Sequence, residues 1–133
     1  MPTTICLDFL LFPDNTPMPL PFTLANFRFS AVAGGMTPFV NVSGAGKGLQ
    51  FADQGIKIKL PFPSSKVSVN IGQFAQPIAI RVLSATGAML ANATTNTPNT
   101  YTTKTFVLRT KAATVILKGG NNEGILAKIC ATM

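Results

Sequence analysis

The sequence contains no histidine and no tryptophan, and only four of its 133 residues are Asp or Glu. The absence of His excludes Ser-His-Asp and Cys-His nucleophiles and most catalytic zinc sites. A glycosidase needs two carboxylates that face each other across a sugar. Asp14 lies in a Pro-rich segment and Asp53 beside a turn, so we interpret both as solvated surface groups. We therefore predict that the chain is not an enzyme.

Charge of either sign is scarce, because Asp, Glu, Lys and Arg together make up 11% of the chain. The 11 basic residues outnumber the 4 acidic ones, and the net charge of +7 favours anionic partners through long-range attraction. The basic residues are spread singly, without a run that would indicate a nucleic-acid partner. Apolar runs such as 115–117 fall far short of the about 20 residues of a spanning helix, so we predict no membrane span.

The start of the sequence lacks the features of a secretion signal. Residues 1–6 contain no basic residue, and Asp8 interrupts the first apolar stretch. Three explanations stay open: a trimmed leader, a module cut from a longer protein, or a protein that works where it is made. Low charge with abundant Thr, Asn, Ala, Gly and Pro is typical of exported or assembled β proteins. We therefore expect an extracellular location or a cell or particle surface.

Alternating apolar and polar residues dominate the chain, and no segment sustains the 3.6-residue period of a helix. The segments 56–60, 67–71 and 78–82 alternate cleanly, as half-buried strands require. Further strands are predicted at 5–11, 27–32, 39–42, 88–92, 102–108, 114–118 and 125–130.

Turn residues punctuate these segments at short intervals. Residues 84–87 and 119–122 supply the Gly and Asn that tight turns need. Four prolines between 13 and 21 predict an extended surface connection, and the glycines of 44–48 predict a flexible loop. About nine or ten short strands at this spacing indicate an all-β fold, a two-sheet antiparallel β-sandwich formed by one domain over 1–133.

The two cysteines lie in the first and the last predicted strands. If these strands are antiparallel neighbours with Cys6 opposite Cys130, Asp8 falls opposite Lys128 and Leu10 opposite Leu126. These pairs are chemically sensible, so we predict that the two ends of the chain meet. A disulfide there would contribute up to about 4–5 kcal/mol in the loop-entropy model. The alternatives are two reduced, buried thiols or an intermolecular bridge.

A structural calcium ion is the one cofactor that the sequence suggests. Glu123 follows the loop 119–122, whose carbonyl groups are suitable ligands, and Asp8 would join it if the chain ends meet. The alternative is that Glu123 only caps or pairs locally.

Ten Phe residues accompany a single tyrosine, Tyr101. Most of the Phe residues lie in or beside strands and are predicted to be core. Tyr101 is then the obvious aromatic candidate for a contact surface, with Lys47 and Lys104 as basic candidates. The alternative is that Tyr101 is an ordinary residue at a strand start.

Several stretches resemble the galactose-binding-like jelly-roll superfamily, which includes many carbohydrate-binding modules of bacterial surface and secreted proteins. The stretches are 6–9, 48–51, 67–74, 77–87, 115–126 and 129–130. The resemblance rests on core and turn positions, and it implies a jelly-roll topology.

Two hypotheses for function follow. The first is a non-catalytic binding module for a glycan or another, anionic, surface polymer, with contacts from loops at one end of the sandwich. The second is a structural subunit that self-associates into an extracellular fibre, appendage or shell, because a low-charge β surface can pair edge to edge.

Overall fold

The computed structural model describes residues 3–44 and 46–133. Within these ranges it contains β-strands and no helix, so no helix there is long and apolar enough to cross a membrane. The strands are β1 (Thr4–Asp8), β2 (Phe22–Leu24), β3 (Phe27–Ala31), β4 (Phe39–Ser43), β5 (Gly46–Phe51), β6 (Ile56–Gln73), β7 (Ile78–Ser84), β8 (Met89–Thr94), β9 (Thr100–Gly119) and β10 (Gly124–Thr132).

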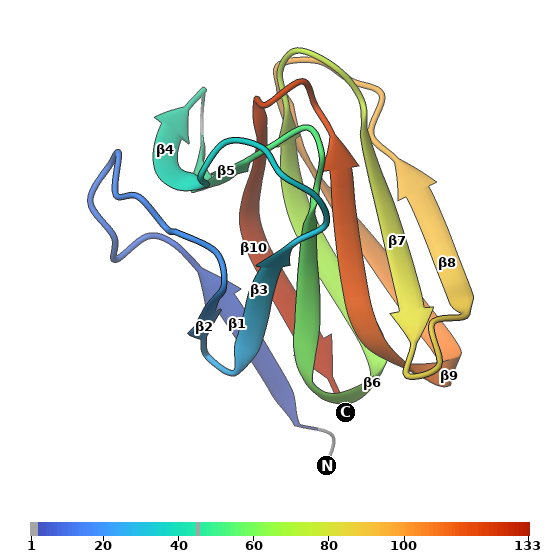
Figure 1. Cartoon of the computed structure of the whole chain (residues 1–133). Helices are drawn as coiled ribbons and strands as arrows, with labels where there is room; N and C mark the ends of the chain where they lie inside the picture. Colours follow the sequence, from blue (N-terminus) through green and yellow to red (C-terminus); the bar gives the residue numbers. More distant parts are fainter. Residues whose placement is uncertain (1–2, 45) are drawn as a thin grey trace.

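The strands form two layers, and the long strands β6 and β9 run through both (Figure 1). The terminal layer consists of β1, β4, β5 and β10 with the 66–73 half of β6 and the 100–107 half of β9. The central layer consists of β2, β3, β7 and β8 with the 56–59 half of β6 and the 112–119 half of β9. All pairings are antiparallel, as predicted for a sandwich.

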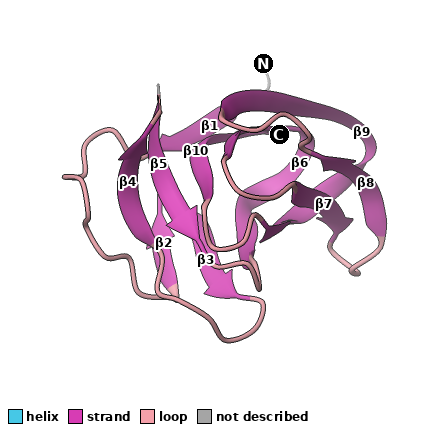
Figure 2. Cartoon of the chain, turned by 90° about the horizontal axis from the view of Figure 1, so that it is seen from above, coloured by secondary structure: helices cyan, strands magenta, loops and turns pink. Residues whose placement is uncertain are grey.

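Figure 2 shows the two layers from above. One hydrophobic core fills the space between them. Phe27 and Phe29 of β3 and Phe51 of β5 are fully buried. Both halves of β6 contribute, with Ile58 from the central layer and Ile71 from the terminal layer. Full burial of one such side chain contributes about 1.5–3 kcal/mol to the stability of the fold. Because alternate residues of each strand point inward, the strands supply the core from one face each.

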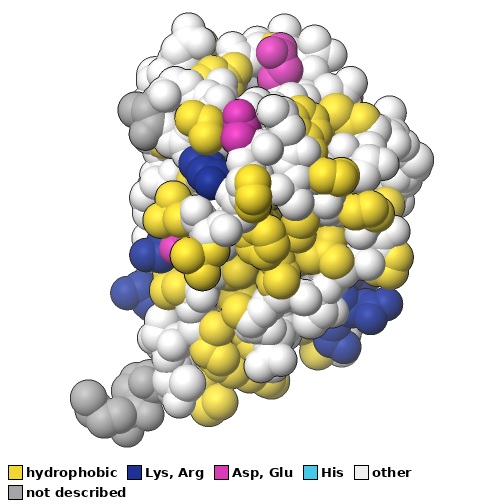
Figure 3. Space-filling view, turned by 90° about the vertical axis from the view of Figure 1, so that its left-hand side faces the viewer, with side chains coloured by type: hydrophobic (Ala, Val, Ile, Leu, Met, Phe, Trp, Pro, Cys, Tyr) yellow, Lys and Arg dark blue, Asp and Glu magenta, His cyan; other side chains and the backbone are white. Residues whose placement is uncertain are grey.

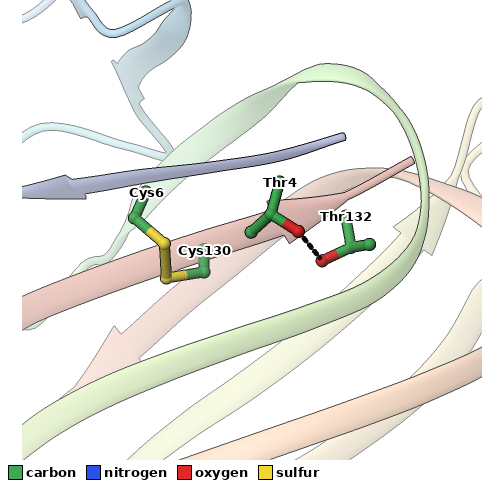
Figure 4. Close-up of a disulfide and its surroundings, with 4 residues drawn as sticks. All are labelled: Thr4, Cys6, Cys130 and Thr132. Atoms are coloured by element: carbon green, nitrogen blue, oxygen red, sulfur yellow. Dashed lines mark hydrogen bonds between the residues drawn. A yellow bond between two sulfur atoms is a disulfide. The ribbon is translucent and has the colours of Figure 1, made fainter. Parts of the chain in front are cut away.

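The two ends of the chain meet, as predicted. Strand β1 pairs with β10, with Cys6 opposite Cys130 and Asp8 opposite Lys128. The two cysteines form a disulfide with Cα atoms 4.1 Å apart, and a hydrogen bond of 3.0 Å joins the hydroxyls of Thr4 and Thr132 beside it (Figure 4).

The predicted pair of Leu10 with Leu126 is wrong. Strand β1 ends at Asp8, whose carboxylate accepts a hydrogen bond from the Leu10 amide at 3.1 Å and turns the chain away. Leu126 instead pairs with Leu49 of β5, and β5 takes the place along β10 that a longer β1 would have occupied.

The predicted boundaries of the long strands are also wrong. The segments 56–60 and 67–71 are one strand, β6, and 102–108 and 114–118 are one strand, β9. The register between them shifts at Ser64, close to Pro61 and Pro63. Proline removes ladder donors and is tolerated at such bulges, so the strand bends from one layer to the other instead of ending.

The glycine-rich segment 44–48 is not a flexible loop throughout. Gly46 and Gly48 belong to β5, and Ala45 lies outside the described residues. A side chain on Gly48 would collide with the Leu126 carbonyl of β10, so glycine permits a close approach of two backbones. The short strand β2, which follows Pro19 and Pro21, was not predicted, because its three residues are too few to show an alternation.

Candidate binding site

A groove of about 530 Å³ lies at the outer side of the terminal layer. Strands β4, β5 and β10 contribute to it, and so do the four loops that join β1 to β2, β6 to β7, β8 to β9 and β9 to β10. Six of its nine lining residues have polar side chains, and the others are two phenylalanines and one isoleucine. They are Asn15, Phe39, Asn41, Ser43, Gln50, Phe74, Asn99, Glu123 and Ile125.

Strand β4 directs its odd-numbered residues into the groove. Phe39, Asn41 and Ser43 alternate with Val40, which is fully buried, and Val42. Successive side chains of a strand point to opposite faces, so one short strand supplies one aromatic ring, one amide and one hydroxyl.

The amides of the groove are held by hydrogen bonds. The Asn41 Nδ2 donates to Gln50 Oε1 at 2.7 Å, and the Gln50 Nε2 donates to the backbone carbonyl of Asn122 at 2.7 Å. The Asn122 Oδ1 in turn accepts from the Asp53 amide at 2.7 Å. A chain of satisfied hydrogen bonds fixes side-chain orientation, so these amides form a preorganised polar floor.

The loop between β1 and β2 forms one rim of the groove. The Asp14 Oδ1 accepts hydrogen bonds from the Val42 amide at 3.0 Å and the Asn15 amide at 3.1 Å. The Asn15 amide also lies 2.6 Å from the Val40 carbonyl oxygen. Asn15 has a φ of 66°, a conformation that Asn tolerates better than most residues. These contacts place Asn15 beside β4.

Tyr101 supports the aromatic side of the groove. Its ring meets the Phe74 ring edge to face, with centroids 5.7 Å apart and an interplanar angle of 76°. The ring also lies on two glycines, because a Cβ added to Gly46 or Gly72 would come within 2.6 Å or 2.7 Å of it. The Tyr101 hydroxyl donates to the Ser43 carbonyl at 2.8 Å, and burial raises the pKa of Tyr101. Tyr101 therefore positions Phe74 and Ser43.

The predicted ligand-binding residues do not line this groove. The Lys47 ammonium donates to the Leu10 carbonyl at 3.2 Å, and Lys104 is half-buried opposite Val69 of β6. Tyr101 lies next to the groove as a support.

The two residues suggested for calcium lie apart along β10. Asp8 is opposite Lys128, whereas Glu123 precedes the first residue of β10 and lines the groove. Among residues 3–44 and 46–133 no three His, Cys, Asp or Glu side chains form a group suited to a metal ion.

Sequence reasoning missed the residues that do line the groove. The alternation of Phe39 and Asn41 was a usable signal, because it puts an aromatic ring and an amide on one face of the predicted strand 39–42, and Ser43 continues the same alternation one residue beyond it. Asn15 and Asn99 gave no signal of proximity, since loops that are distant in the sequence bring them to β4.

Comparison with known proteins gives structural neighbours but no sequence relative. No family model and no curated protein matches the sequence. A point mutant of a family 29 carbohydrate-binding module aligns with a TM-score of 0.50 at 8% identity, covering 99% of this chain and 92% of that chain. A family 32 carbohydrate-binding module from C. perfringens, in complex with galactose, aligns with a TM-score of 0.41 at 11% identity, covering 99% and 93%.

One enzyme also aligns, an arabinose-bound α-L-arabinofuranosidase with a TM-score of 0.46 and 12% identity. The alignment covers 89% of this chain but only 25% of that longer chain. The alignment with the family 29 module over nearly the whole chain, together with the antiparallel strand pairing, shows a jelly-roll β-sandwich fold. The predicted fold class is confirmed, and so is the fold that the resemblance implies.

Proposed function

We propose that the chain is a non-catalytic glycan-binding module and that the groove on the terminal layer is its binding site. The observation that supports this most strongly is the combination of oriented amides, Asn41 and Gln50, with the Phe39 and Phe74 rings in one preformed groove. Sugars present hydroxyl groups and apolar C–H faces. Ligand sites typically pair apolar walls with a few well-placed polar groups.

The fold is consistent with this function, because the structural neighbours are described as carbohydrate-binding modules, one of them in complex with galactose. The disulfide between Cys6 and Cys130 favours an oxidising compartment, so we place the module outside the cell or on a surface. The Asp14 carboxylate accepts a hydrogen bond from the Val42 amide of β4, and the Asp53 carboxylate accepts one from the Asn121 amide of the loop between β9 and β10, so both have a structural use.

A glycan array followed by calorimetric titration of the retained glycans tests the proposal. Phe74→Ala removes one aromatic wall and Asn41→Ala removes one oriented amide, and each should weaken binding by about tenfold, or about 1.4 kcal/mol. Thr105→Ala is the control, because Thr105 is exposed on β9 and does not line the groove. An array without hits, or equal losses in all three variants, would contradict the proposal.

A second candidate function is self-assembly, and exposed apolar side chains on one side of the molecule favour it. Leu11 is 96% exposed, and Leu10 and Val42 are also exposed. The Lys47 side chain connects these residues, since Lys47 pairs with Val42 and donates to the Leu10 carbonyl. Figure 3 shows hydrophobic side chains, in yellow, over the middle of this side. Contiguous apolar surface often marks an interaction site.

Light scattering and negative-stain microscopy separate the two functions. Self-assembly predicts large ordered particles whose size decreases when Leu11→Ser is introduced. A clean monomer at high protein concentration would remove this candidate and leave the glycan-binding proposal unaffected.

A further inference from the structure

The outer face of the central layer collects basic side chains that are scattered in the sequence. We call Arg28, Lys57, Lys59, Arg81 and Lys118 the basic face; all five are exposed. Their neighbours along each strand point inward, so the alternation that builds the core also turns these cations to one side.

The strand register places the basic face across four adjacent strands. Arg28 of β3 is opposite Lys59 of β6, and Lys57 of β6 and Arg81 of β7 both pair with Ile116 of β9. With about 4.8 Å between neighbouring strands, Arg28 and Arg81 are separated by three strand intervals, or about 14 Å. Five of the 11 basic residues therefore share one side of one layer.

No carboxylate lies among these cations. None of the strand segments of the central layer, all of which are described, contains Asp or Glu. Asp8, Asp14 and Asp53 each accept a hydrogen bond from the backbone of a loop or of β4. Figure 3 shows a group of basic side chains at its lower right margin with no acidic side chain beside it. The basic face thus attracts anions.

The chemistry of the basic face favours one class of anion. No aromatic residue lies on the outer side of the central-layer segments of these four strands, 27–31, 56–59, 78–84 and 112–119, all of which are described, so the basic face lacks the stacking platform of single-strand nucleic-acid sites. A flat multi-stranded layer also does not enter a duplex groove, which admits a helix or a two-stranded ribbon. Leu11, the most exposed large apolar side chain among the described residues, lies in the β1–β2 loop and does not belong to the basic face, so it does not mark this face as a surface for membrane insertion.

Hydroxyl and amide side chains lie between the cations. Ser30 is opposite Lys57, Thr114 is opposite Lys59, and Asn92 is opposite Arg81. A polymer that carries both regularly spaced anionic groups and many hydroxyls would use both kinds of side chain, and Arg binds carboxylate and sulfate groups in a bidentate manner. We propose that the basic face binds an extended acidic polysaccharide, sulfated or uronic, at a second site separate from the groove.

The test uses heparin and polygalacturonate as acidic polysaccharides, and dextran as the neutral control. The triple variant Lys57→Gln, Lys59→Gln, Arg81→Gln should bind both acidic polymers at least tenfold more weakly than the unmodified protein at low salt. The control triple variant Lys66→Gln, Arg109→Gln, Lys111→Gln removes the same charge from outside the basic face and should lose less than threefold. Binding should weaken with added salt because the contacts are ionic.

Several outcomes would overturn the proposal. Equal losses in the two triple variants would show that only net charge matters, and no binding to either acidic polymer at low salt would exclude the site. Tighter binding of duplex DNA or of anionic lipid vesicles than of both polysaccharides would assign the face to another partner. Asn41→Ala, a variant of the groove, should leave heparin binding unchanged. The proposal for the groove and the proposal for the basic face are therefore tested independently. Circular dichroism verifies that each variant is folded.

Discussion

The outer faces of the two layers differ in chemistry although both are built by the same alternation. The terminal layer carries the disulfide, rows of Thr, Ser and Asn, and the amide-lined groove, whereas the central layer carries five cations and no carboxylate. The inner faces are alike, because each layer contributes branched aliphatic and Phe side chains to one core. Stability is therefore shared between the layers, while the outward positions are free to specialise.

The largest expected effect concerns the terminal layer alone. The double variant Cys6→Ser, Cys130→Ser removes the disulfide that links two residues 124 positions apart in the sequence. It should lower the free energy of unfolding by about 4 kcal/mol. Urea unfolding of the double variant, compared with the unmodified protein under oxidising conditions, measures the loss. A decrease below about 1 kcal/mol would mean that the β1–β10 pairing holds the chain ends without the bridge.

Core truncation should affect the two layers equally. Ile58→Ala and Ile71→Ala remove fully buried side chains from opposite halves of β6, and each should cost about 2–5 kcal/mol. Both variants should unfold in one cooperative transition, because the two halves serve one core. Two separate transitions in either variant would show that the layers are independent units.

A single methyl group should disturb the groove. In Gly72→Ala the new Cβ would come within 2.7 Å of the Tyr101 ring and 3.0 Å of the Phe74 ring. The rings must move, so we expect a loss of about 1–3 kcal/mol in stability and weaker glycan binding. Gly34→Ala is the control, since a Cβ there meets nothing within 4 Å. Equal stability of the two variants would argue against the packing of Tyr101 described above.

The smallest expected effect is the pH dependence due to Tyr101. Burial raises the pKa of its hydroxyl above the ordinary value of 10.0, so the folded state favours the protonated form. The resulting stabilisation is present below that value and is lost as the pH rises through the folded pKa. Because the chain has one Tyr and no Trp, tyrosinate absorbance reports this group alone. A pKa at or below that of the urea-unfolded chain would contradict the burial of the Tyr101 hydroxyl.

The sequence was most informative where alternation and pairing chemistry coincide. The rhythm of 56–60 and 78–82 indicated strands, and the pairing of Cys6 with Cys130 gave the correct register of the chain ends. It was least informative where tertiary contacts override local signals. The predicted strand 56–60 stops just before Pro61 and Pro63, but strand pairing before and after these prolines carries β6 through a bulge.

The candidate site was difficult to predict for the same reason. The groove depends on loops that precede and follow β4 in the sequence and that carry Asn15 and Asn99. No local sequence pattern indicates that these loops lie beside β4. The basic face is different, because Lys57 and Lys59 already shared a face in the alternation. Only the strand order, which places β3 and β7 on either side of the β6 and β9 pair, joins Arg28 and Arg81 to them.

Nuclear magnetic resonance mapping of a bound glycan tests the central claim most directly. A glycan that the array identifies is titrated into the labelled protein, and backbone and side-chain amide shifts are followed residue by residue. We expect the largest shifts at Asn41, Gln50 and Phe74. Shifts confined to strands of the central layer, with these three residues unchanged, would contradict it.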